Sequence, residues 1–169
     1  MQISLDRTEI ELGGLVRKVV ARFEPDIVRA DCPVVVNGES PPVVGWWDRS
    51  RIDQVVANLL GNALKFGSGK PIEISITRSD TSAILSVRDH GIGIDPAQQD
   101  RIFERFQRAV SERHYGGLGL GLYICHRIVR AHGGSIRVES SPGAGALFIV
   151  ELPLGGAGRS REPQECPSQ

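Results

Sequence analysis

Two runs of alternating residues in the middle of the chain constrain its fold most strongly. Apolar and polar side chains alternate along "PIEISITR" at residues 71–78 and along "SAILSVRD" at residues 82–89, and only "SDT" separates the two runs. Alternation puts every second side chain on one face of a strand, and so short a connection joins antiparallel neighbours. The sequence therefore predicts a β-hairpin, and with it a sheet that has one buried face.

Helices are predicted on both sides of this hairpin. In "SRIDQVVANLLGNALKF" at residues 50–66, the apolar residues recur at the spacing of one helical face. They are Ile52, Val55, Val56, Leu59, Leu60 and Ala63. Gly67 and Gly69 are expected to end this helix. A second helix is predicted from Leu118 to His132, and its broad apolar surface indicates that it is buried.

The remaining segments complete a mixed architecture. Residues 8–30 have helical spacing interrupted by glycines and a proline, which predicts a helix followed by a break. "PVVV" at 33–36 and "VVGWW" at 43–47 are expected to form a pair of strands, and two further strands are predicted at 135–141 and 146–154. The fold class is thus α/β, a two-layer α/β sandwich with a mixed sheet and helices on one face.

Length and composition limit the function classes. We expect one domain over residues 1–154 and a disordered tail at 155–169, which is rich in glycine, proline and charge. Twenty basic and twenty acidic residues cancel, so no general field attracts nucleic acid or an anionic membrane. Three separated cysteines fit neither a disulfide framework nor a zinc site. With no signal peptide and no apolar run near ~18 residues, a cytoplasmic location is expected.

A polar stripe runs along the helix predicted at residues 50–66. Gln54, Asn58, Asn62 and Lys65 share one face of this helix, opposite the apolar one. A solvated surface is the simplest explanation of such a stripe. Amide oxygens also suit Mg²⁺, which takes one or two protein oxygens and fills its other positions with phosphate and water.

Two glycine-containing stretches are further candidates for a binding site. "DHGIGI" at residues 89–94 follows a strand, so that Asp89 could accept from an exocyclic amine while Gly91 and Gly93 let a flat ring approach. An aspartate-led turn explains the same residues. "GGLGLGL" at 116–122 leads into a helix, where free amides and the helix dipole favour phosphate, although a glycine hinge needs no ligand.

Together these stretches resemble one family. "NLLGNALKF", "DHGIGI", "IFERFQR" and "GGLGLGL" follow the order and spacing of the N, G1, F and G2 boxes of the ATP-binding domain of sensor histidine kinases, in the superfamily that includes DNA gyrase. The likeness extends through "HGGSIRVESSPGAGALFIVELP" and covers most of the chain from Leu5 to Leu154. It implies a Bergerat-type ATP-binding fold with ATP and Mg²⁺ as ligands.

The resemblance also assigns roles to individual residues. Asn62 would bind Mg²⁺, Asn58 and Lys65 would act beside it at the phosphates, and Asp89 would accept from the adenine amino group. The segment from 95 to 116 would form a lid over ATP, anchored by Phe103 and Phe106, with Arg105 or Arg108 reaching the γ-phosphate. Further nucleotide contacts are expected from Gly91, Gly93, Ile94, Gly117, Leu118, Gly119, Leu120, Gly121 and Leu122.

The identity of residue 58 bears on the phosphate acceptor. Relatives that hydrolyse ATP or phosphorylate serine tend to have glutamate where this chain has Asn58. An amide takes no proton from water or a hydroxyl, whereas a neutral imidazole already has a free lone pair, so histidine is the expected acceptor. None of the four histidines has the family's acceptor context, and ordinary packing or surface roles are expected for them. They are His90, His114, His126 and His132.

The resemblance therefore implies the catalytic part of a longer kinase. Its partners would be a dimerisation domain that carries the phosphoacceptor histidine and the receiver domain of a response regulator. No nucleic acid and no direct membrane contact are expected. Three alternatives stay open: a serine kinase of the anti-sigma type, which Asn58 disfavours; a degenerate module that uses ATP only to set its conformation; and a gyrase-like ATPase, for which the chain is short.

Overall fold

The structure, a computed structural model, describes residues 2–38, 40–67, 69–104 and 120–155. Its strands are β1 (Arg7–Glu11), β2 (Val34–Asn37), β3 (Val44–Asp48), β4 (Ile72–Arg78), β5 (Ser82–Asp89), β6 (Ser135–Ser140) and β7 (Ala146–Pro153). Its helices are α1 (Leu12–Arg22), α2 (Glu24–Ala30), α3 (Arg49–Phe66), α4 (Pro96–Gln99) and α5 (Gly121–Ala131). The predicted tail lies outside the described residues, apart from Gly155.

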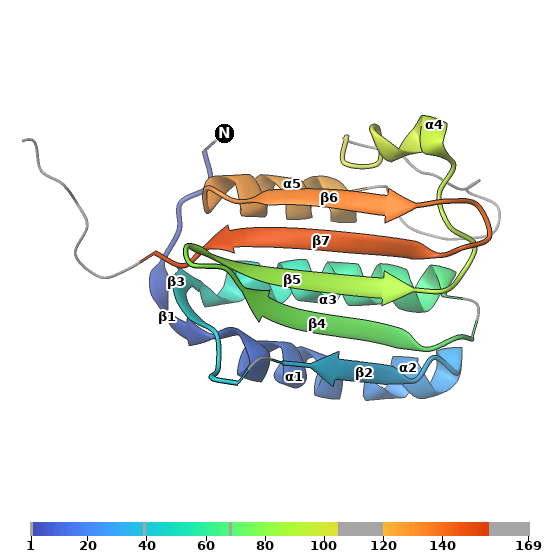
Figure 1. Ribbon diagram of the computed structural model, residues 1–169, viewed down its shortest axis with the longest axis horizontal. Coiled ribbons are helices and arrows are strands. Elements are labelled where there is room, and N and C mark those ends of the chain that lie inside the picture. Colours follow the sequence, from blue (N-terminus) through green and yellow to red (C-terminus); the bar gives the residue numbers. More distant parts are fainter. Residues whose placement is uncertain (1, 39, 68, 105–119, 156–169) are drawn as a thin grey trace, which may run out of the picture.

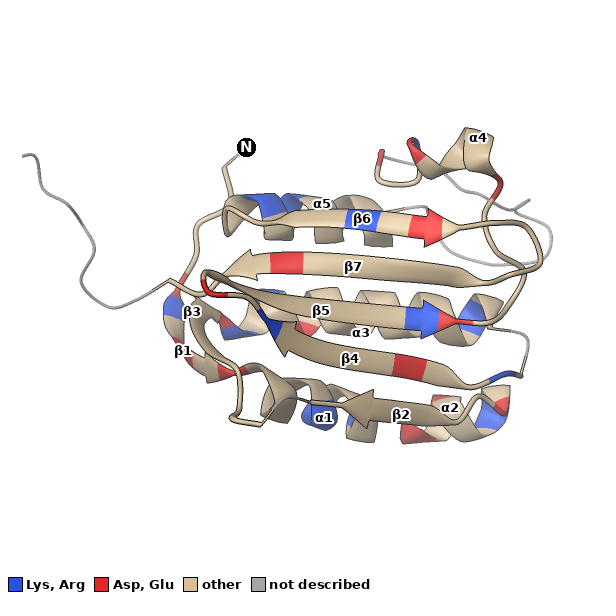
Figure 2. Cartoon of the chain, in the orientation of Figure 1, with Lys and Arg blue, Asp and Glu red and all other residues tan. Residues whose placement is uncertain are grey.

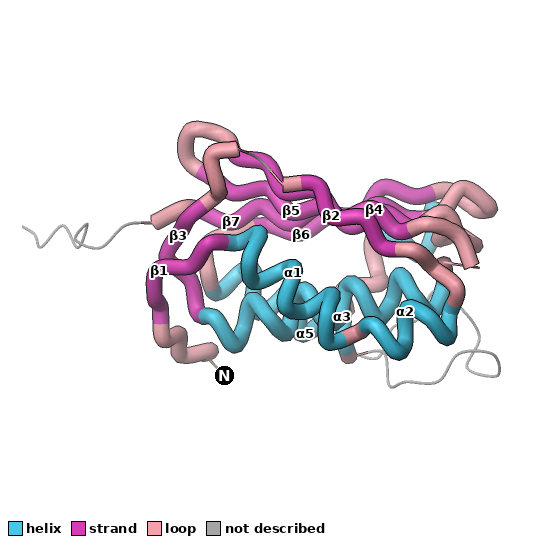
Figure 3. The backbone as a smooth tube through the Cα atoms, turned by 90° about the horizontal axis from the view of Figure 1, so that it is seen from below, coloured by secondary structure: helices cyan, strands magenta, loops and turns pink. Residues whose placement is uncertain are grey.

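One mixed sheet and one layer of helices form the body of the molecule (Figures 1 and 3). The sheet has the strand order β2-β4-β5-β7-β6, in which β2 runs parallel to β4 and every other pair is antiparallel. Helices α1, α3 and α5 cover the same face, so the predicted two-layer sandwich is confirmed (Figure 3). The β4–β5 hairpin and the helix before it also lie where the sequence predicts them.

The N-terminal third differs from its prediction in two ways. Residues 7–11 form strand β1 instead of the start of a helix, whereas the predicted break in the helix is present at Phe23, between α1 and α2. Strands β2 and β3 do not pair with each other: β2 adds to the edge of the main sheet beside β4, and β3 pairs with β1 in a separate two-stranded ribbon. Both errors concern pairing between distant segments, which local periodicity does not encode.

The core lies between the sheet and the helices. The apolar face predicted for α3 is fully buried, from Ile52 to Ala63, against the inward side chains of β4, β5 and β7. Trp47 is 1% exposed and its indole Nε1 donates to the carbonyl of Pro153 at 2.8 Å, as expected for a core tryptophan. Charged residues of both signs are scattered along the strands of the main sheet (Figure 2). No helix in the described ranges is long and apolar enough to span a membrane.

Candidate nucleotide-binding site

The site predicted from the motifs gathers at one end of the sandwich, on the right in Figure 1. There the end of β5, the end of α3, the beginning of α5 and the β6–β7 turn come together. Of the polar stripe on α3, Gln54, Asn58 and Asn62 are half-buried, and Lys65 is exposed. Asn58 donates from Nδ2 to the carbonyl of Gly121 at 3.3 Å, which links the stripe to the first residue of α5.

Asp89 is the most unusual charged residue of this end. It is 5% exposed, it is the last residue of β5, and it lies opposite Ala146 in the sheet register. Its Oδ1 accepts from the backbone N–H of Gly91 at 3.0 Å. Burial raises the pKa of Asp89, while hydrogen bonds from the amides of Gly91 and Ala146 and the neighbouring His90 side chain lower it. A buried carboxylate with few donors retains lone pairs for another donor.

The turn after Asp89 is packed against backbone from two other elements. A Cβ on Gly91 would lie 1.6 Å from the carbonyl oxygen of Phe66, at the end of α3, and that same oxygen accepts from the N–H of Ile92 at 3.3 Å. Gly93 has φ +71°, and a Cβ there would lie 2.0 Å from the carbonyl oxygen of Ser141. Only glycine fits at these two positions: lack of space excludes a side chain at both, and at Gly93 the left-handed backbone conformation disfavours one as well.

The β6–β7 turn supplies a wall that sequence reasoning missed. Gly145 N–H donates to the carbonyl of Gly91 at 3.1 Å, and the Ser140 hydroxyl accepts from Ile94 N–H at 2.8 Å while donating to the Gly145 carbonyl. Gln99 Nε2 donates to the carbonyls of Ile94 and Ser140 at 3.1 and 2.6 Å. These contacts fix the exit of β5 and the start of the segment that follows. All of them use at least one backbone atom, and the side chains that take part, Ser140 and Gln99, belong to no motif.

Two pieces of the predicted lid and glycine run are described, and both lie next to α5. Phe103 packs against the His126 ring of α5 and edge-on against Phe148 of β7, with ring centroids 6.0 and 6.3 Å apart. At the other end, Leu120, Gly121 and Leu122 lead into α5 and are half-buried. The predicted roles of Arg105, Phe106, Arg108, Gly117, Leu118 and Gly119 concern positions outside the described residues.

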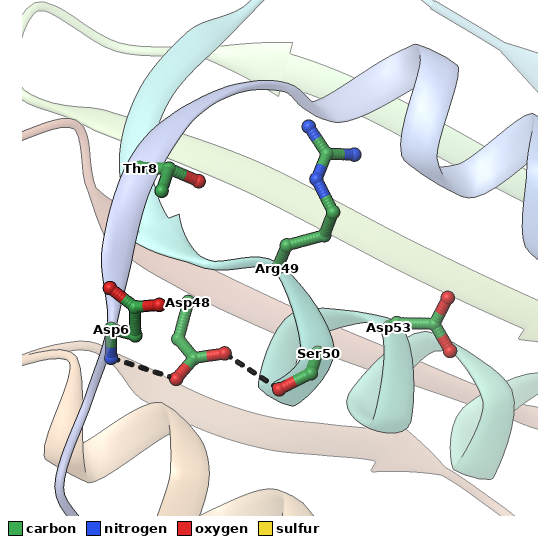
Figure 4. Close-up of a pocket in the computed structure, with 6 residues that line it drawn as sticks. All are labelled: Asp6, Thr8, Asp48, Arg49, Ser50 and Asp53. Atoms are coloured by element: carbon green, nitrogen blue, oxygen red, sulfur yellow. Dashed lines mark hydrogen bonds between the residues drawn. The ribbon is translucent and has the colours of Figure 1, made fainter.

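A separate open pocket of about 610 Å³ lies at the opposite end of α3 (Figure 4). Asp6, Thr8, Asp48, Arg49, Ser50 and Asp53 line it. Two of its carboxylates already have protein partners: Asp48 caps α3, and Asp53 forms a two-armed ion pair with Arg22 at 2.7 and 3.0 Å. The pocket therefore serves the packing of β1 against α3 and offers little to a ligand.

The residues near the end of β5 fit a magnesium nucleotide. The buried Asp89 carboxylate can accept from an amine, and Gly91 and Gly93 keep the turn free of side chains. Among the described residues, no three His, Cys, Asp or Glu side chains gather to hold a metal ion. The donors that this site offers Mg²⁺ are amide oxygens of α3, a ligand type that the ion combines with phosphate oxygens and water.

Comparison with known proteins agrees with this geometry. A family model described as Histidine kinase-, DNA gyrase B-, and HSP90-like ATPase matches residues 47–156. The chain belongs to this family. Its match begins at the last residues of β3, includes α3, β5, α5 and the β6–β7 turn, and so contains every element that builds the site.

Similar proteins of known type are histidine kinases and phytochromes. Cyanobacterial phytochrome A of Nostoc sp. is 38% identical over 94% of this chain and 20% of its own length. Sensor histidine kinase RppB of Synechocystis sp. is 38% identical over 85% of this chain and 32% of its own length. This ATPase-family chain therefore spans a fifth to a third of the curated relatives that it matches.

Solved structures give the same assignment at the level of one domain. The catalytic domain of histidine kinase ThkA has a TM-score of 0.79 and 31% identity, covering 89% of this chain and 99% of that one. Full-length ShkA in complex with AMPPNP has a TM-score of 0.83 and 30% identity, covering 93% and 33%. ThkA in complex with response regulator TrrA has a TM-score of 0.75 and 31% identity, covering 89% and 42%. Within its family, this chain is thus of the histidine-kinase catalytic type.

Proposed function

We propose that this chain binds Mg·ATP and delivers the γ-phosphate to a histidine on a separate dimerisation domain, from which a response regulator receives it. The observation that carries the proposal is the position of Asn58. It lies on the helix whose last residue, Phe66, supports the turn after Asp89, and its side chain is held by the first residue of α5. Helix α3 thereby connects the proposed adenine site, next to its last residue, to the proposed phosphate site along its polar stripe.

Asp89 would recognise the adenine. An ionised carboxylate accepts a hydrogen bond from the exocyclic amine, and a buried acceptor distinguishes strongly against a base that lacks this donor. The Gly91 amide orients the carboxylate, and the glycines of the turn allow the ring to lie against backbone. Ile94 would add an apolar contact beside the ring.

The phosphates would lie along the polar stripe of α3 and at the beginning of α5. Asn62 would be the protein ligand of Mg²⁺, and Lys65 and the amides of Gly117, Gly119 and Gly121 would neutralise phosphate charge. Bound ATP supplies an activated phosphoryl group, which needs positioning and charge neutralisation more than covalent help. Arg105 or Arg108 would reach the γ-phosphate, with Phe106 beside the nucleotide.

Asn58 favours histidine as the acceptor. An amide cannot take a proton from water or from a serine hydroxyl, so the site lacks a general base at this position. A neutral imidazole attacks through a lone pair that it already has. ThkA was solved with a response regulator, which supports a receiver domain as the next partner. ATP is abundant in the cytoplasm, where we propose that the domain acts.

Titration with a fluorescent ATP analogue, with and without Mg²⁺, tests the nucleotide site. We expect saturable binding that ATP displaces, that Asp89→Asn weakens in both conditions, and that Asn62→Asp alters only when Mg²⁺ is present. Absence of binding at millimolar nucleotide would remove the basis of the proposal. Lys70→Gln serves as the control, because Lys70 is an exposed residue of the loop after α3.

A chimera tests the acceptor. In it, this chain replaces the matching catalytic part of RppB, which keeps its own dimerisation and phosphoacceptor region. Radiolabelled γ-phosphate should become attached in an acid-labile, alkali-stable form, as phosphohistidine is. Label that survives acid would indicate serine or threonine, and nucleotide binding without any transfer would favour the module that uses ATP only to set its conformation.

A further inference from the structure

Ser140, the last residue of β6, lies in the same row of the sheet as Asp89. In the strand register Ser140 is opposite Ala146 of β7, and Ala146 is opposite Asp89 at the end of β5. Side chains in one row point to the same face, which here is the face that the helices cover (Figure 3). Two strand spacings, roughly 10 Å, separate Ser140 from Asp89, so it acts on Asp89 only through the segments between them.

The Ser140 hydroxyl binds two backbone groups at once. Its oxygen accepts from the N–H of Ile94 at 2.8 Å, and its hydrogen is donated to the carbonyl of Gly145. A hydroxyl has one hydrogen to donate and lone pairs that accept, so one small side chain satisfies both groups. The β6–β7 turn and the segment after Asp89 are thereby joined through a single oxygen atom.

Hydrogen bonds continue from Gly145 to the Asp89 carboxylate. The Gly145 N–H donates to the Gly91 carbonyl at 3.1 Å, and the Gly91 N–H donates to Oδ1 of Asp89 at 3.0 Å. One residue further on, the Ile92 carbonyl accepts from the Gly143 N–H at 2.7 Å. The β6–β7 turn therefore determines where the residues directly after Asp89 lie, and with them the direction of its carboxylate.

Gln99 of α4 supports the same connection from a second element. Its Nε2 donates to the carbonyl of Ile94 at 3.1 Å and to the carbonyl of Ser140 at 2.6 Å. An amide NH₂ group has two hydrogens, and these two carbonyls use both of them. Ser140 and Ile94 are thus linked twice, directly through the hydroxyl and indirectly through Gln99.

We infer that Ser140 is a positioning residue for base recognition: its hydroxyl holds Ile94, the proposed apolar contact of the adenine ring, and through the β6–β7 turn it orients the Asp89 carboxylate. Gln99 assists by holding the same connection from α4. This inference rests on the proposed function. It makes selection of the base depend on a residue at the end of β6 that acts only through other residues.

The first test measures hydrogen exchange of backbone amides by nuclear magnetic resonance, in the chain without nucleotide. Ser140→Ala removes the acceptor of the Ile94 N–H, so this amide should exchange at least about tenfold faster than in wild type. Ser140→Thr keeps a hydroxyl and should preserve slow exchange. Ser135→Ala, the same change at the exposed first residue of β6, should leave the Ile94 amide unaffected. Unchanged exchange of this amide in folded Ser140→Ala would overturn the inference.

The second test compares Mg·ATP with the Mg²⁺ complex of purine riboside triphosphate, which lacks the 6-amino group. Displacement of the fluorescent analogue gives both affinities. Wild-type chain should prefer ATP by about tenfold, as expected for one hydrogen bond to a charged group. In Ser140→Ala this preference should fall to about threefold or less, because the carboxylate is no longer held toward the amine. Ser140→Thr should keep the preference.

A preference for the amino group that stays intact in Ser140→Ala would overturn the inference, whether both affinities fall by the same factor or neither changes. An equal loss for both nucleotides would show that Ser140 only supports the fold.

Gln99→Glu tests the support from α4. The change puts an oxygen atom in place of the NH₂ group that faces two carbonyls, so the preference for ATP should fall in the same direction as in Ser140→Ala. Gln98→Glu makes the same chemical change one residue earlier in α4 and is the matched control. Equal effects of the two variants would mean that charge on α4, and not the contacts of Gln99, is responsible.

Failure of the inference and failure of the proposed function are distinguishable. If wild-type chain prefers ATP and Asp89→Asn abolishes this preference, but Ser140→Ala keeps it, the proposed function stands and the positioning role is wrong. If wild-type chain does not bind ATP, or binds both nucleotides equally, the proposed role of Asp89 is wrong, and that of Ser140 is wrong as well. Melting temperatures of all variants show whether each remains folded at the temperature of the measurement.

Discussion

Two buried aspartates, Asp48 and Asp89, follow strands at opposite ends of α3, and their surroundings have opposite effects on their charge. Asp48 is 7% exposed and Asp89 is 5% exposed, so burial does not distinguish them. Burial alone would raise the pKa of each. Hydrogen bonds from three residues outweigh burial at Asp48 and lower its pKa, whereas at Asp89 burial prevails and the pKa is raised.

The partners of Asp48 explain its structural role. Its carboxylate accepts from Asp6 N–H at 2.9 Å, from the Ser50 hydroxyl at 2.8 Å and from Arg51 N–H at 3.2 Å, which caps α3. Its own N–H donates to Nε2 of His132 at 3.1 Å, and Nδ1 of that ring donates to the Ile128 carbonyl. These contacts join the segment before β1, the beginning of α3 and the end of α5, a packing role of the kind predicted for the histidines.

The comparison teaches how to separate a structural carboxylate from a binding one. Both residues are strand-end aspartates, and an aspartate-led turn explains either of them in the sequence. The difference is the number of donors that the fold supplies. A buried carboxylate that receives hydrogen bonds from the protein on all sides stabilises the structure. A buried carboxylate whose lone pairs are partly unused is a candidate for recognising a ligand.

The largest expected effect comes from filling the space beside Asp89. Gly91→Ala would put a methyl group against the Phe66 carbonyl, and we expect a loss of at least about 3 kcal/mol in the free energy of unfolding. Gly61→Ala is the matched control, since Gly61 lies inside α3 with its nearest contact at 3.9 Å. That change should stabilise the chain by about 0.5–1 kcal/mol. Urea denaturation measures both, and equal values would refute the close approach.

Asp89→Asn should affect binding far more than stability. It replaces an acceptor by a group that can present NH₂ to the adenine amine, so we expect nucleotide affinity to fall ~10- to 100-fold. The free energy of unfolding should change by less than about 0.5 kcal/mol, because relief of the cost of burying the charge offsets weaker hydrogen bonds from Gly91 and Ala146. Isothermal calorimetry and denaturation on the same preparations check this. Full affinity in the variant would remove Asp89 from base recognition.

Asp48→Ala should show the reverse pattern. The variant lacks the cap of α3, and the donors on Asp6 and Ser50 lose their acceptor. We expect the free energy of unfolding to fall by about 2 kcal/mol. Nucleotide affinity should stay within about twofold, since the 18-residue α3 separates the two ends by about 27 Å. A parallel loss of affinity in a folded variant would mean that the two ends are coupled through the helix.

The smallest effect is a difference in pH dependence. Asp48 contributes stability that is present above its unfolded pKa, near 3.8, and is lost as the pH falls through its lowered folded pKa. Asp89 binds its proton more tightly when folded, so its ionisation costs stability at neutral pH, and that cost disappears as the pH falls through its raised folded pKa. Between pH 7 and pH 3, the stability of Asp48→Asn relative to wild type should rise on acidification, because wild type loses the contribution of Asp48, and the stability of Asp89→Asn relative to wild type should fall, because wild type is relieved of its cost. Parallel curves would contradict the assignment.

The sequence predicts those elements whose apolar residues fit only one spacing, either the helical or the alternating one. α3 and the β4–β5 hairpin fall within a residue of their predicted bounds, because their apolar residues fit one spacing only. β1 was missed because Ile10 and Leu12 fit an alternating pattern as well as a helical one. What makes residues 7–11 a strand is pairing with β3, where Thr8 lies opposite Trp47, and no local pattern contains that information.

Part of the site was likewise beyond sequence reasoning. Asp89, Gly91 and Asn58 stand in recognisable stretches. The Phe66 carbonyl and the Gly145 amide act through backbone that every residue has. Their contributions depend on which segments the fold brings together, so they become visible only in three dimensions.

The place of β7 in the sheet has a consequence for biosynthesis. This last described strand lies between β5 and β6, in the interior of the sheet, and begins beside Asp89. The ribosome extends the chain from its N-terminus, so α3 and β5 are synthesised before β7, the neighbour of β5 in the sheet. Gly145, which contacts the turn after Asp89, is also synthesised after them. The emerging chain therefore has no complete site for a nucleotide until synthesis has passed residue 153, and premature termination within β7 would yield a product without the site rather than one with weakened affinity.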